Sequence, residues 1–238
     1  MTKLKHCLLI LFIVTGPVQA VTQNLLVFSK TNGFRHESIA AGKEALDSLA
    51  ASNDFSIYFT EDSLAFTRNN LSKYDALIFL SPSGDVFNEE QQDALQHYIR
   101  SGGGFVGIHG ASTVEYDWPW YGKLVGSYFA DHPKVQEAEL HVLASHLATE
   151  HLPDPWIRSD EWYNFRSALD DSIQVLLTVD EQTYTGGKMG NHHPIAWYHE
   201  FDGGRAFYTA LGHTKASYRE PHFLNHILGG IKWVCSKD

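Results

Sequence analysis

Short apolar stretches alternate with segments of helical periodicity along the first half of the chain. Stretches of about four to eight apolar or alternating residues are typical of strands, and continuous ones indicate burial on both faces. We expect such strands at residues 24–29, 55–60, 75–80 and 105–108. Helical spacing predicts a helix over 38–49, and Asn88 with Gln91 forms a capping-box pattern for a second helix that ends near Arg100. This alternation predicts a parallel sheet covered by helices on both faces.

The second half shows strand patterns that are separated by loops instead of helices. These patterns cover residues 135–142, 173–179, 195–199 and 206–211. A last helix is predicted over 220–234. No internal repeat and no linker divides the chain beyond its first segment, so we predict one domain over residues 21–238.

Residues 1–20 have the pattern of a signal peptide. Lys3 and Lys5 precede an apolar stretch at 7–14, and Val18-Gln19-Ala20 has the small residues of a cleavage site. The apolar stretch is much shorter than the roughly 20 residues that cross a bilayer. We therefore expect cleavage after Ala20 and a periplasmic or secreted protein without membrane insertion. An uncleaved anchor is the alternative.

Charge and cysteine content narrow the range of partners. The chain has a formal net charge of −10 at pH 7, which argues against nucleic acid and anionic membrane surfaces. A neutral substrate, or a site that holds a cation, fits this charge. After cleavage Cys235 is the only cysteine, so no internal disulfide can form and packing must supply the stability.

The polar residues near the ends of the predicted strands are mostly histidines. In open parallel sheets, ligands bind beyond the carboxyl ends of the strands. The residues singled out on this basis are His36, His109, His132, His213 and the carboxylate of Glu161. Neutral imidazole is the commonest metal-binding side chain, and a carboxylate often completes such a site. Spacing alone does not separate ligands from ordinary hydrogen-bonded histidines, but the strand-end rule places His109 and His213 above the same sheet edge.

Residues 103–111 (GGFVGIHGA) carry the most informative local pattern. A strand that runs into Gly-x-His-Gly resembles a nucleophile elbow, the sharp turn that exposes one side chain. The residue at that position is His109, which can act as a ligand or as a general acid or base. A plain strand-to-helix turn with a solvated histidine is the alternative. The chain has no Gly-x-Ser-x-Gly, and Gly102–Gly104 lacks the partners of a phosphate loop, so we expect neither a serine hydrolase nor a nucleotide-binding protein.

Large aromatic side chains cluster near these segments. The ones that we predict to bind a sugar are Trp118, Trp120, Tyr121, Trp162 and Tyr163. Flat aromatic faces suit sugar rings, which present apolar C–H faces edged by hydroxyls. Ordinary packing against the sheet is the alternative.

Five segments in this order resemble the ThuA-like (trehalose utilisation) family. They are Gly33–His36, Gly103–Ala111, Phe129–Pro133, Asp160–Tyr163 and Pro194–His213. The resemblance implies a class I glutamine amidotransferase-like fold, a flavodoxin-like three-layer α/β sandwich with added strands in the second half. It also implies that His109 stands where amidotransferases carry their cysteine, and that His213 stands where they carry the activating histidine. Both should then share one pocket, and glutaminase chemistry is excluded because thiolate attack needs a thiol.

The resemblance further implies a carbohydrate ligand, namely trehalose-type disaccharides or their 3-keto derivatives. On this basis we expect a metal-assisted hydrolase or lyase that binds Zn²⁺ or Mn²⁺ through His109, His132 and His213. His109, Glu161 and His36 are the predicted catalytic residues, and Glu161 or His36 is the expected general base. A non-catalytic periplasmic sugar-binding protein is the rival hypothesis, and the sequence leaves a homo-oligomer open. Residues 186–193, rich in glycine and histidine, have no place in the family pattern.

Overall fold

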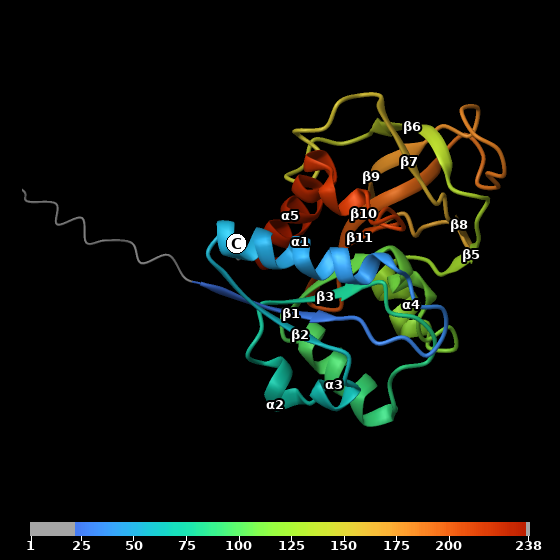
Figure 1. Cartoon of the computed structure of the whole chain (residues 1–238). Coiled ribbons are helices and arrows are strands. Elements are labelled where there is room, and N and C mark those ends of the chain that lie inside the picture. The colour runs from blue at the N-terminus through green and yellow to red at the C-terminus, as the bar shows by residue number, and fades with distance from the viewer. Residues whose placement is uncertain (1–21, 237–238) are drawn as a thin grey trace, which may run out of the picture.

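A mixed sheet of nine strands forms the centre of residues 22–236, the part of the chain that our computed structural model describes (Figure 1). The strand order is β2-β1-β3-β4-β11-β10-β9-β6-β7. Neighbours from β2 to β11 are parallel, and neighbours from β11 to β7 are antiparallel. The strands of this sheet are β1 (Gln23–Phe28), β2 (Phe55–Thr60), β3 (Ala76–Leu80), β4 (Gly104–Ile108), β6 (Gln136–Val142), β7 (Trp156–Asp160), β9 (Gln174–Val179), β10 (His193–Phe201) and β11 (Gly204–Thr209). A separate small sheet pairs β5 (Phe129–Asp131) with β8 (Asn164–Phe165).

Helices cover both faces of the parallel half of the sheet. Helices α1 (Ser38–Ser52) and α5 (Pro221–Cys235) pack together on one face, whereas α2 (Arg68–Leu71) and α3 (Glu89–Arg100) lie on the other (Figure 1). Helix α4 (Pro119–Val125) packs against β11. Every residue of β3 and β4 is buried, as expected for central strands between two helical layers. The predicted α/β fold, a parallel sheet with added strands in the second half, is therefore confirmed.

Local signals in the sequence set several element boundaries correctly. The side chain of Asn88 accepts a hydrogen bond from the Gln91 amide at 3.0 Å, and the Gln91 side chain accepts one from the Asn88 amide at 3.0 Å. This is the predicted capping box, and it satisfies two amides that the first turn of α3 leaves without partners. The helix ends at Arg100, as expected.

Two elements near the candidate site do not follow from the apolar pattern. Strand β7 alternates buried and exposed residues, but two of its three buried side chains are Arg158 and Asp160, so the pattern looks polar. Helix α4 begins with Pro119 at its first turn and is only seven residues long. Both elements depend on tertiary packing, which overrides local propensity.

Some expectations concern residues outside this description. The predicted signal peptide, residues 1–20, lies outside the described residues. Among the residues that the structure describes, no helix combines the length and the apolar character that crossing a membrane requires.

Matched leucine substitutions test the core. Leu77 in β3 is fully buried, whereas Leu64 is 73 % exposed. We expect Leu77→Ala to lower the free energy of unfolding by about 2–5 kcal/mol, because it removes buried apolar surface and leaves a cavity. Leu64→Ala should change it by less than about 0.5 kcal/mol. Urea unfolding followed by circular dichroism measures both, and equal effects would contradict this assignment of the core.

Candidate functional site

His109 lies at the turn that follows β4, the strand between β3 and β11. Its backbone has φ 49°, in the left-handed region that residues with a Cβ seldom adopt. The next residue has to be small, because a Cβ on Gly110 would lie 3.0 Å from the Pro82 carbonyl oxygen. The predicted elbow is therefore formed. The prediction that it exposes its side chain is wrong: His109 is 0 % exposed, because neighbouring loops close over the ring.

The main chain of the neighbouring strand orients the imidazole of His109. Its Nδ1 atom lies 2.7 Å from the carbonyl oxygen of Ala210, which follows β11. A carbonyl oxygen can only accept, so Nδ1 carries the proton and donates it. In the neutral ring Nε2 then carries a lone pair, and that lone pair points away from β11. A hydrogen bond of this kind commonly fixes the tautomer of a metal-binding histidine.

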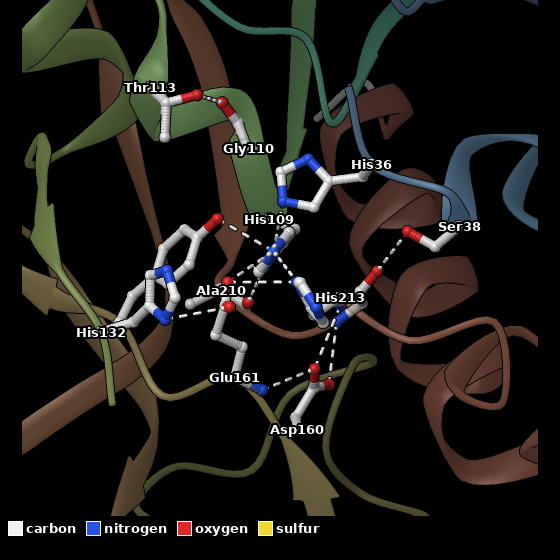
Figure 2. Close-up of polar contacts among 12 residues, drawn as sticks. His36, Ser38, His109, Gly110, Thr113, His132, Asp160, Glu161, Ala210 and His213 are labelled. Carbon is white, nitrogen blue, oxygen red and sulfur yellow. Dashed lines mark hydrogen bonds and ion pairs between the residues drawn. The ribbon is translucent and has the colours of Figure 1, made fainter. Parts of the chain in front are cut away.

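Three other side chains converge on Nε2 of His109 (Figure 2). The Nε2 atom of His36 lies 3.1 Å away, and Nδ1 of His213 lies 3.2 Å away. The Oε2 atom of Glu161 is 3.4 Å from His109 Nε2 and 3.1 Å from His213 Nδ1. His36 comes from the loop after β1, His213 from the loop after β11, and Glu161 directly follows β7. The predicted meeting of His109 and His213 is thus present in the structure, with two further groups.

This arrangement suits a metal ion in its donor types and in the four donor distances given above. One donor atom from each of His36, His109, Glu161 and His213 lies within 4.8 Å of all the others. Donors that bind one ion at about 2.1 Å lie roughly 3.0–3.4 Å from their neighbours, and the four distances above fall in that range. His36 also has a buried Nδ1 without a hydrogen-bond partner. Three imidazoles and a carboxylate are donors that Zn²⁺ and Mn²⁺ accept.

Burial and mutual contact shift the pKa values in the cluster. Burial, followed by repulsion from His109 and His213, lowers the pKa of His36 to about 3, so that ring stays neutral. Burial alone would raise the pKa of Glu161, but the nearby imidazoles of His109 and His213 outweigh it and lower that pKa to about 2. The hydrogen bond that His213 donates to Glu161 raises the pKa of His213. The cluster therefore holds a carboxylate anion beside the neutral ring of His36.

Two more side chains contact the cluster without belonging to the group of four. The hydroxyl of Tyr163 lies 2.9 Å from His109 Nε2, and burial raises its pKa well above the ordinary value, so it stays protonated and donates. His132, predicted as a metal ligand, lies outside the group: its Nδ1 is 2.9 Å from Oε1 of Glu161, on the side away from His109. His36, predicted as a catalytic base, is instead among the four convergent donors.

A pocket of about 430 Å³ opens above the cluster. Its lining consists of Gly33, Phe34, His36, Ser83, Gly84, Thr113, Tyr116, Phe129, His132, Glu161, Tyr163 and His213. His109 has no exposed surface and closes the base beneath these residues. The hydroxyl of Ser83 donates to the Phe34 carbonyl at 2.7 Å, which ties the loop after β3 to the loop that carries His36.

The structure corrects most of the predicted aromatic contacts. Trp162 and Tyr121 are fully buried; the Trp162 indole donates to the Gln136 carbonyl, and the Tyr121 hydroxyl donates to the Ala111 carbonyl. Trp118 and Trp120 stack on each other away from the pocket lining. Of the five predicted aromatic residues only Tyr163 lines the pocket. The high frequency of aromatic residues in this part of the sequence could not reveal which way each ring faces.

The aromatic wall of the pocket comes from residues that we did not predict. Phe34, Tyr116 and Phe129 line it together with Tyr163. Phe34 is 68 % exposed and packs edge-on against His36. The sequence signal for this wall was a phenylalanine two residues before His36, in the loop that follows the first predicted strand.

Residues 186–193, to which the sequence analysis assigned no role, contact the segments that carry two residues of the site. Lys188 donates its backbone amide to the Asn164 side chain at 2.9 Å, and its ammonium group pairs with Asp131 at 2.7 Å. The Nε2 atom of His193 lies 2.8 Å from the Tyr163 carbonyl oxygen and donates to it. This loop therefore holds the segments that carry His132 and Tyr163.

Comparisons with known proteins relate the sequence and the fold of this chain to one family. The family described as trehalose utilisation (ThuA) matches residues 24–234, and no curated protein matches the chain. A protein of Bacteroides uniformis described as ThuA-like is 22 % identical, with a TM-score of 0.78 over 92 % of this chain and 95 % of that chain. One from Parabacteroides merdae is 21 % identical, with a TM-score of 0.76 over 90 % of each chain.

A more distant likeness concerns the amidotransferase fold. A Thermoplasma acidophilum protein described as part of a GMP synthase is 13 % identical, with a TM-score of 0.53 over 90 % of this chain and 94 % of that chain. Likenesses at these identities establish the fold alone. They confirm the glutamine amidotransferase-like architecture predicted from the sequence.

The pairing of Glu161 with His213 gives a pH-dependent prediction. Because the folded-state pKa of His213 is raised above 6.5, protonation of this ring stabilises the fold. That stabilisation is complete below the unfolded pKa and is lost as the pH rises through the folded value. In Glu161→Gln we expect the pKa of His213 to fall toward 6.5, because its largest cause is removed. Histidine ring signals in an NMR titration of chelator-treated protein measure this shift.

Glu181→Gln provides the matched control for that titration. Glu181 contacts His193 at 2.8 Å and belongs to the supporting loop region instead of the cluster. This variant should leave the pKa of His213 unchanged. An unshifted His213 in Glu161→Gln, or the same shift in both variants, would show that the carboxylate of Glu161 does not set the pKa of His213.

Proposed function

The chain belongs to the ThuA (trehalose utilisation) family, whose role is carbohydrate-related, and we propose that it is an exported, carbohydrate-processing enzyme. Its substrates are trehalose-type disaccharides or their 3-keto derivatives, and its chemistry is metal-assisted hydrolysis or elimination. One observation carries the proposal. Four donor atoms, from His36, His109, Glu161 and His213, converge at the base of a pocket large enough for a sugar ring.

The four convergent residues are proposed to hold a single Zn²⁺ or Mn²⁺ ion. This set replaces the predicted one, because His36 and Glu161 join His109 and His213 while His132 lies outside. When bound, such an ion acts as a Lewis acid that polarises a sugar carbonyl oxygen or lowers the pKa of a water molecule. The low pKa of His36, about 3, keeps its ring neutral and available as a donor at physiological pH.

The walls of the pocket suit an uncharged sugar. Phe34, Tyr116, Phe129 and Tyr163 offer apolar faces, against which the C–H face of a pyranose ring packs. Among the lining residues there is no lysine or arginine, and Glu161 is anionic. A phosphate or carboxylate on the sugar would therefore meet no lysine or arginine among the lining residues. This supports neutral disaccharides over sugar phosphates.

Proton transfer is assigned to His132 and hydrogen-bond donation to Tyr163. Glu161, with a pKa of about 2, is a weak base, so the predicted role of Glu161 as the base passes to the half-exposed His132 at its side. In a 3-keto sugar, the C–H bond at C2 is acidic. His132 removes that proton, the C1–O bond breaks, and the leaving sugar oxygen takes the proton back from the imidazolium. Addition of water to the resulting double bond completes a net hydrolysis.

Metal binding tests the first half of the proposal. Protein stripped with a chelator and dialysed against Zn²⁺ or Mn²⁺ should retain about one ion per chain by elemental analysis. His109→Ala should lose more than ~100-fold in affinity, because one of four ligands is removed. His141→Ala is the control: His141 is a surface residue paired with Asp154, and the variant should bind like the parent. Equal binding by His109→Ala and the parent would refute the site.

Turnover tests the second half. Incubation with trehalose, 3-keto-trehalose and trehalose 6-phosphate should consume the 3-keto sugar fastest and the phosphate least, as chromatography of the products would show. His132→Ala should lower kcat by about 10²–10⁴-fold, as expected for a lost general base. Phe34→Ala should raise KM about fivefold, the equivalent of roughly 1 kcal/mol of aromatic contact.

Trp120→Ala serves as the aromatic control and should leave KM unchanged, because Trp120 does not line the pocket. Tight binding of a disaccharide without any turnover would replace the enzyme hypothesis with the non-catalytic sugar-binding protein. A fall in kcat that is equal in His132→Ala and Trp120→Ala would remove the assigned role of His132.

A further inference from the structure

Asp160, the last residue of β7, contacts the backbone of two residues in the cluster. It is 0 % exposed. Its Oδ1 atom accepts hydrogen bonds from the amide of Glu161 at 3.0 Å and from the amide of His213 at 3.1 Å. One carboxylate oxygen thus joins the main chains of two proposed ligands (Figure 2).

The second oxygen of Asp160 is equally engaged. Oδ2 accepts from the Gly212 amide at 2.9 Å, from Nη2 of Arg158 at 3.0 Å and from the Ser217 hydroxyl at 3.3 Å. Arg158 supplies a balancing positive charge inside the protein, which a buried carboxylate requires. The carboxylate is therefore held firmly on both sides.

Arg158 in turn is fixed by the surrounding structure. Its guanidinium lies 4.7 Å from the ring centre of Trp156 and 4.9 Å from that of Phe223. Its Nη1 atom lies 3.2 Å from Oε2 of Glu220 at the start of α5. The position of Asp160 is thus anchored to α5 as well as to β7.

The hydrogen bonds of Asp160 matter because the segments that carry Glu161 and His213 follow strands that are far apart in the sheet. In the sheet, β7 and β11 are separated by β10, β9 and β6. No strand pairing therefore sets the distance between Glu161 after β7 and His213 after β11. The shared Oδ1 atom of Asp160 does so directly.

We propose that Asp160 is a positioning residue that sets the spacing of Glu161 and His213. Its effect on ion binding rests on the metal site proposed above, whereas its effect on the two loops does not. Partners of this kind orient metal ligands, and their loss typically costs about 10–100-fold in metal affinity. Asp160 itself does not line the pocket and is not one of the four convergent donors.

Asp160→Asn tests this role with almost no change in volume. In either orientation the amide NH₂ faces hydrogen-bond donors, which are the Glu161 and His213 amides in one case and the Gly212 amide and Arg158 in the other. We expect hydrogen exchange to become at least about tenfold faster at the amides of Glu161, Gly212 and His213 in metal-free protein. We also expect an affinity loss of about 10–100-fold for Co²⁺, with an altered visible spectrum of the bound ion.

Ser217→Ala is the matched control, because it removes one hydrogen bond to Oδ2 and leaves Oδ1 untouched. It should change exchange at Glu161 and His213, and the Co²⁺ spectrum, much less than Asp160→Asn. Unchanged protection of these amides in Asp160→Asn would overturn the proposal, as would a uniform loss of protection across the sheet. If the parent protein binds no metal ion, the proposed metal site fails, and the exchange data alone decide the role of Asp160.

Discussion

The parallel pairing of β4 with β11 is the constraint on which the site depends. Ile108 is in register with Thr209, so the residues that follow, His109 and Ala210, leave the sheet side by side. The Ala210 carbonyl can then take the Nδ1 proton of His109 in a hydrogen bond. Because this bond fixes the tautomer, Nε2 of His109 presents a lone pair at the base of the pocket. A shift of β11 by one residue would move each of its side chains to the opposite face of the sheet. The Ala210 carbonyl would then no longer face His109, and the cluster would not form.

The shifted pKa values allow these titratable side chains to be buried close together. Three imidazoles could not all ionise so close together, and the low pKa of His36 shows how burial and repulsion prevent it. Glu161 supplies the one negative charge and keeps it, because the imidazoles of His109 and His213 lie close to it and lower its pKa. The cluster therefore carries an anion beside the neutral ring of His36, and a divalent cation would complete its charge and its coordination. Among these four described residues, Nδ1 of His36 is the one buried side-chain polar atom without a hydrogen-bond partner.

The sequence predicted the structure correctly where the local pattern of apolar residues agrees with the burial that the tertiary fold imposes. The strand ends after β1, β4 and β11 were readable from apolar stretches, and they correctly brought His36, His109 and His213 to one edge. The contribution of β7 was harder to see, because Arg158 and Asp160 occupy positions of its buried face that would ordinarily be apolar. Aromatic residues misled for a related reason: their abundance indicates burial or binding equally well, and only the packing separates Trp162 from Phe34. Polar groups buried for function break the patterns that prediction relies on.

The elbow after β4 differs chemically from that of an amidotransferase. The elbow after β4 holds an imidazole where a nucleophile of that class needs a thiol. Cys235 cannot substitute, since it ends α5, and the Gly104–Val234 contact places that end of the helix beside the beginning of β4. The elbow lies at the opposite end of that strand. What the turn retains is its geometry, a left-handed residue that aims one side chain at the neighbouring loops. With histidine there, and with Glu161 brought in from the end of β7, the same geometry brings four donor side chains together where it would otherwise expose a nucleophile.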